Sequence, residues 1–161
     1  MERYPRLFIQ TALIYLLIGV ILGVVIGTDP MLAVRFRFVH IHLNLLGFMV
    51  MIIAGVAYHV LPRFTARTMP WPAGVKYHFY LQNIGLLGML GTKLTDDIWT
   101  AGGKTIFVLF AVVTASGLFI MICNLFCVLL PRGSTCEHAK ESLTRPRKAC
   151  EEDCFHDLPA D

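Results

Sequence analysis

The stretch FRFVHIHLNLLGFMVMIIAGVAYHVL, residues 36–61, is long and apolar enough to cross a bilayer as a single helix, and it therefore decides the fold. His40 and His42, near its start, are two residues apart, which on a helix means about 200° of rotation and about 3 Å of rise. Their imidazoles leave the helix on nearly opposite sides and cannot chelate one ion together. Each could bind a separate large, flat cofactor on its own side, and haem fits that description.

The composition of the whole chain excludes a soluble domain. The chain has 161 residues, of which 56% are hydrophobic, and a mean hydropathy of +0.64. We predict an all-α fold, a four-helix transmembrane bundle, with spans at 7–27, 36–61, 77–94 and 105–130. The third span is the weakest, because its first turns are polar. Residues 1–131 would form the haem-binding membrane domain, and 132–161 a polar tail that we expect to be flexible.

The basic residues predict the orientation of these helices. With four spans, both termini lie on the same side of the membrane as the loop between the second and third helices. That side carries ten of the fourteen Lys and Arg residues: Arg3, Arg6, Arg63, Arg67, Lys76, Arg132, Lys140, Arg145, Arg147 and Lys148. Because positive charge is retained inside, we predict cytoplasmic termini and a multi-pass protein of the inner, cytoplasmic membrane. The net charge of +3 reflects this topology and gives no case for a nucleic-acid partner.

One broad face of the second predicted helix presents a ligand and then small or flexible residues. It comprises His40, Asn44, Gly47, Met51, Gly55 and Tyr58. A porphyrin lying edge-on against a helix needs that clearance, so Asn44 and Gly47 are predicted cofactor contacts. His42 begins the opposite face.

Two other sets of residues bear on a cofactor. Gly19, Gly23 and Gly27 form a small-residue stripe on the first predicted helix, for which helix packing is favoured over a cofactor groove. The basic residues on the outer side could pair with haem propionates or be ordinary interfacial residues. These are Arg35, Arg37, Lys93 and Lys104.

A second pair of histidines, His59 and His78, is predicted at the cytoplasmic end of adjacent helices. The pair could hold a second haem, although interfacial hydrogen bonding is the favoured interpretation. The cysteines fall into two sets. Cys123 and Cys127 are predicted to lie on the apolar face of their helix. The tail residues could bind zinc or an iron–sulfur cluster, but a loose, reactive tail is the favoured interpretation. The tail set is Cys136, His138, Cys150, Cys154 and His156.

The residues around the histidine pair resemble a known family. VHIHLNLLG at 39–47 and GVAYHVLPRF at 55–64 are similar to the tenth helix of haem-copper oxidase subunit I. The likeness is greatest to the cbb-type cytochrome c oxidases and nitric oxide reductases, and YHFYLQNIG at 77–85 resembles the start of their eleventh helix. The resemblance covers about residues 35–126. It implies that His40 and His42 are axial ligands of two different haems of the b type.

The chain also departs from this family. The family subunit has three similar four-helix arcs, and this chain resembles the last of them. The copper ligands and the other low-spin haem ligand belong to the missing arcs, so a monomer cannot reproduce the binuclear centre. A symmetric oligomer could hold a haem between His40 of one protomer and His42 of its neighbour. By analogy with the threefold plan we favour a homotrimer, with a dimer as the alternative.

These features favour a small b-type cytochrome of the membrane that transfers electrons between a quinol or another redox subunit and an acceptor. One alternative is a haem protein with an open axial position that reduces or senses nitric oxide or oxygen. Another is a non-redox accessory protein derived from an oxidase. No titratable pair indicates hydrolysis and no Gly-rich phosphate loop precedes a helix, so an electron carrier is favoured over an independent enzyme.

Overall fold

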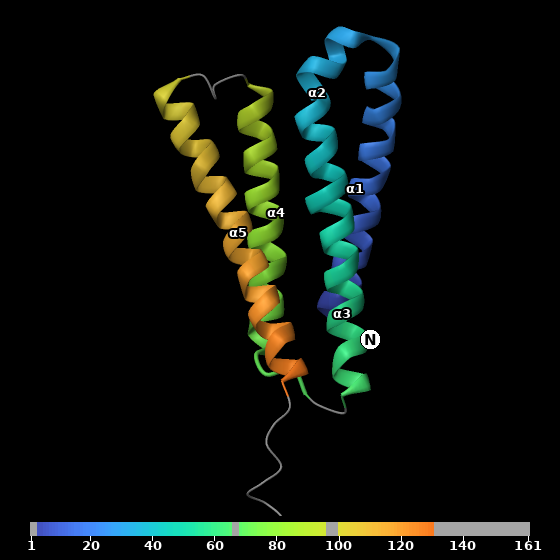
Figure 1. Ribbon diagram of the computed structural model, residues 1–161, viewed down its shortest axis with the longest axis vertical. Helices are drawn as coiled ribbons and strands as arrows, with labels where there is room; N and C mark the ends of the chain where they lie inside the picture. Colours follow the sequence, from blue (N-terminus) through green and yellow to red (C-terminus); the bar gives the residue numbers. More distant parts are fainter. Residues whose placement is uncertain (1–2, 66–67, 96–99, 131–161) are drawn as a thin grey trace, which may run out of the picture. The chain divides into compact units, whose positions relative to one another are not determined.

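The computed structural model describes residues 3–65, 68–95 and 100–130, and every regular element in these ranges is a helix (Figure 1). The predicted tail, with Cys136, Cys150 and Cys154, lies outside the described residues, and so does Arg67. The all-α class predicted from the sequence is confirmed.

Four long helices follow one another along the chain. The first is α1 (Arg3–Thr28). The second is continuous from residue 30 to residue 64 and consists of α2 (Pro30–His42), the π-helix η1 (Leu43–Met49) and α3 (Val50–Phe64). The third and fourth are α4 (Pro72–Leu94) and α5 (Ala101–Leu129). The order matches the four predicted helices.

The helix that carries the histidine pair begins at Pro30, earlier than the predicted Phe36. Asp29 caps it: its backbone is extended, and its side-chain oxygen accepts a hydrogen bond from the backbone N–H of Met31 at 2.8 Å. Proline suits the first position of a helix, because its fixed φ is already helical and its missing N–H would have had no partner there. Asp-Pro was therefore a readable start signal.

Two other helix boundaries also differ from the prediction. The second helix was expected to stop before Pro62, but it runs through it to Phe64, so proline is accommodated within its last turn. The third long helix, α4, begins at Pro72 rather than Tyr77, again with proline in the first turn.

Three segments among the described residues are long and apolar enough to span a membrane: 3–28, 30–64 and 102–129. The chain is therefore a membrane protein on this criterion. The remaining long helix, α4, does not meet it, because polar side chains interrupt its apolar sequence. His78 and Gln82 among them are wholly buried against the other helices rather than exposed.

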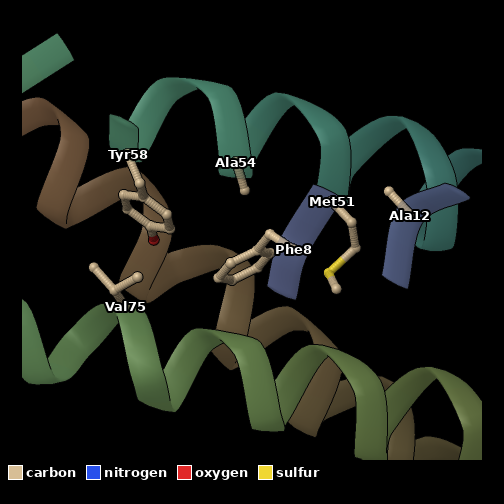
Figure 2. Packing of buried hydrophobic residues seen from close by; sticks show 6 residues of the cluster. All are labelled: Phe8, Ala12, Met51, Ala54, Tyr58 and Val75. Carbon is tan, nitrogen blue, oxygen red and sulfur yellow. The ribbon is translucent and has the colours of Figure 1, made fainter. Parts of the chain in front are cut away.

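Two apolar clusters hold α1 against the long second helix. In the first cluster, drawn in Figure 2, Phe8 and Ala12 of α1 pack on Met51 and Ala54 of α3, with Tyr58 and Val75 beside them. The second cluster joins Tyr15 of α1 to residues of α2, η1 and α4, namely Val39, Leu43, Leu86, Met89 and Leu90. Since lipid tails are as apolar as these side chains, close packing rather than the hydrophobic effect holds such helices together.

The helices α4 and α5 approach each other closely because α4 has glycines on that side. A side chain at Gly85 would meet Thr114 of α5, and one at Gly88 would meet the ring of Phe110. The outward faces carry exposed apolar side chains, as expected of a surface in contact with lipid; Leu17, Val24 and Phe119 are examples. The interior thus combines apolar clusters with a few buried polar side chains such as His78 and Gln82, whereas the outer faces are apolar.

Candidate functional site

His40 lies against α1. Its Nδ1 is 3.0 Å from the carbonyl oxygen of Gly19. A carbonyl oxygen can only accept, so Nδ1 carries the hydrogen and Nε2 carries the lone pair in the neutral ring. The ring edge also occupies the space beside Gly23, where an added Cβ would be 2.9 Å from its Cε1. Two glycines of the stripe on α1 therefore accommodate His40 and set its orientation.

His42 makes the same kind of bond on a different side of the helix. Its Nδ1 donates to the carbonyl oxygen of Phe38, one turn earlier, at 2.9 Å. The imidazole stacks on the Phe38 ring, with 3.8 Å between ring centroids and 26° between planes. Phe38 in turn packs against Phe107 of α5 at 5.8 Å. His40 thus faces α1 and His42 lies on the side toward α5, in agreement with the predicted divergence.

Both imidazoles are half-buried and have the same tautomer. Histidines that bind a metal through one ring nitrogen almost always donate the other N–H to a carbonyl or carboxylate, which fixes the ring and raises its basicity. In His40 and His42 the Nε2 atoms have the lone pairs. The donor set therefore fits axial ligation of haem iron.

Asn44 and Gly47, the predicted cofactor contacts, hold α1 in place. The side-chain amide of Asn44 donates to the carbonyl oxygen of His40 at 2.8 Å and fills the space beside Gly19. Its nitrogen is also 3.4 Å from Nδ1 of His40, but both atoms carry hydrogens in this tautomer, so no hydrogen bond forms there. Gly47 faces the ring of Tyr15. The clearance expected for a porphyrin below His40 is thus filled by α1.

Three of the four predicted propionate partners at this end are exposed. Arg35 and Arg37 lie on α2 within two turns of the histidine pair, with the Arg35 guanidinium 5.7 Å from the ring centre of Phe36. Lys104 is exposed near the start of α5, and Lys93 is half-buried near the end of α4. Flexible cations in these positions can reach an anionic group, as the sequence suggested.

The second pair of histidines is not brought together. His78 is wholly buried, and its Nδ1 lies 3.0 Å from the hydroxyl oxygen of Tyr58. The ring of Phe8 lies 4.9 Å from its ring. His59 is half-buried and has no contact with His78 among the described residues. His78 is thus enclosed by the side chains around it, and its hydrogen bond to Tyr58 agrees with the favoured interpretation.

The π-helix η1, which begins directly after His42, was not among the predicted elements. A π-helix contains an extra residue per turn and often marks a functional site. Here the carbonyl oxygen of Leu46, inside η1, accepts a hydrogen bond from the side-chain amide of Gln82 at 3.1 Å. Gln82 belongs to α4, so only the tertiary arrangement reveals this partner. Its presence in an apolar segment was the available signal.

The cysteines of α5 match their prediction. Cys123 and Cys127 are exposed on the apolar outer face, one turn apart. In the described part of the chain, no group of three or more His, Cys, Asp or Glu side chains could hold a metal ion. A metal within these residues would thus need to bring other ligands, as haem iron does with its porphyrin.

Comparison of the chain with family models, with curated proteins and with solved structures finds no match in any of the three. Function must therefore be inferred from the residues and their geometry.

Proposed function

We propose that the chain is an integral membrane b-type cytochrome, related to one four-helix arc of haem-copper oxidase subunit I, which binds haem through His40 and His42 and transfers electrons. The observation that carries this proposal is the shared hydrogen bonding of the pair. Each imidazole donates Nδ1–H to a backbone carbonyl, so its Nε2 holds the lone pair that could bind iron. Histidine within a membrane span is costly and usually functional.

The haem is of the b type, held by its iron and by contacts rather than by covalent bonds. The sequence has no Cys-x-x-Cys-His, the pattern that attaches c-type haem. Held by His40 and His42, a haem would supply one-electron transfer. The chain's part is to orient the two rings and to exclude water with apolar helices.

The packing of α1 supports a haem between protomers. Tyr15 fills the face below His40, so a porphyrin on that side must lie beyond the α1–α2 pair rather than inside one chain. His40 of one protomer would then face His42 of the next. Because the two histidines lie on different sides of one helix, the contact between protomers is head-to-tail, and such a contact forms a ring when the rotation between protomers closes. By the oxidase likeness the ring is a homotrimer, with a dimer as the alternative.

The membrane arrangement follows from the same proposal. The third long helix, α4, also crosses the bilayer and completes the four spans, because its polar residues His78, Gln82 and Asn83 are hydrogen-bonded to other helices. The protein then lies in the inner membrane of the cell, with both termini in the cytoplasm. A quinol or another redox subunit supplies or accepts the electrons.

Visible spectroscopy of the protein purified in detergent tests the proposal. We would record reduced-minus-oxidised spectra and pyridine haemochrome content for the wild type, His40→Ala, His42→Ala and His59→Ala. The last variant is the matched control, because His59 is a half-buried histidine of the same helix outside the pair. We expect a low-spin b-type spectrum that is lost in the first two variants and kept in the third.

Two other outcomes would change the conclusion. A reduced spectrum that shifts with carbon monoxide would indicate an open axial position and favour gas reduction or sensing. Absence of haem in the wild type would refute haem binding and leave the accessory role.

A further inference from the structure

The helix α4 carries two polar side chains that are wholly buried and four residues apart on one face. His78 and Gln82 have no exposed surface. Each has one polar atom with a partner and one without. Among the described residues, no hydrogen-bond partner exists for Nε2 of His78 or for Oε1 of Gln82. Buried polar groups in proteins are almost always paired, and in a membrane span water from outside cannot serve them.

The partnered atoms decide what the other two atoms must be. The amide nitrogen of Gln82 donates to the carbonyl oxygen of Leu46 at 3.1 Å, so its Oε1 is an acceptor aimed elsewhere. The Tyr58 hydroxyl lies 3.0 Å from Nδ1 of His78. The hydroxyl hydrogen of Tyr58 can be accepted by Nδ1 only if Nδ1 has the lone pair of the imidazole. The ring hydrogen is then on Nε2. The two orphan atoms are thus a donor and an acceptor.

These two atoms do not bond to each other, since both are without a partner. A single small molecule that accepts from one and donates to the other satisfies both. The opposite wall is Gly117 of α5: an added Cβ would lie 3.5 Å from Cδ2 of His78 and 3.3 Å from the backbone nitrogen of Gln82. The missing side chain at Gly117 thus keeps that edge of the imidazole clear. The ring of Phe8 covers another side of His78.

We propose that one water molecule binds between Nε2 of His78 and Oε1 of Gln82, inside the helices. It completes a directed series of hydrogen bonds from Tyr58 to His78, water, Gln82 and the carbonyl oxygen of Leu46. Each group in this series donates to the next one. Internal waters of proteins occupy such places, between polar groups that lack other partners.

The series connects α3 and α4 to the π-helix but is not a proton wire. It ends at a backbone carbonyl, and the amide of Gln82 does not readily relay a proton. Its effect is to hold the polar face of α4 inside the protein and to fix η1. The site does not depend on haem, so it stands whether or not the chain is a cytochrome.

Proton-detected solid-state NMR of the full chain in lipid bilayers, with ¹⁵N-labelled histidine, tests the site. The His78 signals are assigned by their loss in His78→Leu. We expect a hydrogen on Nε2, none on Nδ1, and a cross-peak from the Nε2 proton to the water frequency. In Gln82→Met the cross-peak should disappear. In the control Asn83→Met it should persist, because Asn83 is an amide of the same helix that bonds Tyr15 instead.

The wild-type spectrum alone can overturn the proposal, whatever the folding of the variants. A hydrogen on Nδ1 of His78, or an Nε2 proton without a water cross-peak, would exclude the water as described. Persistence of the cross-peak in a folded Gln82→Met variant would show that Gln82 is not a partner. Because the measurement needs no haem, it can be repeated in His40→Ala, which separates it from the proposed function.

Discussion

The side-chain amide of Gln82 in α4 donates to the backbone carbonyl of Leu46, 3.1 Å away, inside the π-helix that follows the histidine pair. A π-helix leaves carbonyls whose usual α-helical partners are displaced, so an outside donor stabilises it. If η1 relaxed to an α-helix, the rings of His40 and His42 would rotate relative to α3. Gln82 is therefore a positioning residue for the pair.

Replacement of Gln82 by Leu should lower the free energy of unfolding by about 1–3 kcal/mol, because it leaves the Leu46 carbonyl buried without its partner. Haem content should fall with it. Unfolding in mixed detergent micelles and haemochrome assays measure the two effects. Ile84→Leu is the control, since Ile84 is exposed on the same helix. Equal stability of the two variants would contradict the role of this bond.

The glycine stripe of α1 offers a matched pair of substitutions. In Gly23→Ala the added Cβ would be 2.9 Å from Cε1 of His40 and would displace the ring, whereas Gly27→Ala meets nothing within 4 Å. Changes that disturb the orientation of a metal-binding histidine typically cost about 10–100-fold in affinity. We expect a loss of haem affinity in that range for Gly23→Ala and none for Gly27→Ala, measured by haem titration. Equal affinities would mean that His40 is not held by this contact.

The exposed guanidinium groups on α2 should influence the haem electrostatically. In the double variant Arg35→Gln/Arg37→Gln, two positive charges near the pair are removed, which disfavours the reduced and less positive iron. We expect the midpoint potential to fall on the order of 60 mV, a tenfold change in the equilibrium. Potentiometric titration measures it, with Lys76→Gln as the control at the predicted cytoplasmic side. A potential that is unchanged or higher would argue against propionate pairing.

The hydroxyl of Tyr58 should matter for stability, since it is the partner of the buried His78. Tyr58→Phe leaves Nδ1 of His78 without a donor and should cost about 1–3 kcal/mol of unfolding free energy. Tyr80→Phe serves for comparison, because Tyr80 is 48% exposed and loses only a surface hydroxyl. Thermal unfolding followed by circular dichroism compares them. A Tyr58→Phe variant as stable as Tyr80→Phe would show that the pair contributes nothing.

The sequence was sufficient for the helices and for the divergence of the histidines, because both follow from local spacing. Apolar length predicts a helix, and a separation of two residues predicts rings on different sides. The start at Pro30 was also readable from Asp-Pro. The partners of His40 and His78 could not be predicted from the sequence. Gly19 and Tyr58 come from other helices and contact these histidines only through tertiary packing. The hydrogen bond from Gln82 to the π-helix likewise joins residues far apart in the sequence.

Mixed oligomers provide the sharpest test of a haem held between protomers. Neither His40→Ala nor His42→Ala alone can form a site with both ligands. When the two variants are expressed together, a contact in which His40 comes from one and His42 from the other restores a complete pair. Random mixing gives such contacts at about one quarter of the head-to-tail interfaces, whatever the ring size.

We therefore expect about one quarter of the wild-type haem in the co-expressed, purified mixture, against none in either variant alone. Tags on each variant, purified in sequence, would raise this fraction by selecting mixed assemblies. Haem restored in this way requires two chains for each iron, because no single chain in the mixture has both histidines. If the mixture binds no haem although the wild type does, the two ligands of a haem are not His40 of one protomer and His42 of its neighbour. That result would refute the ring arrangement.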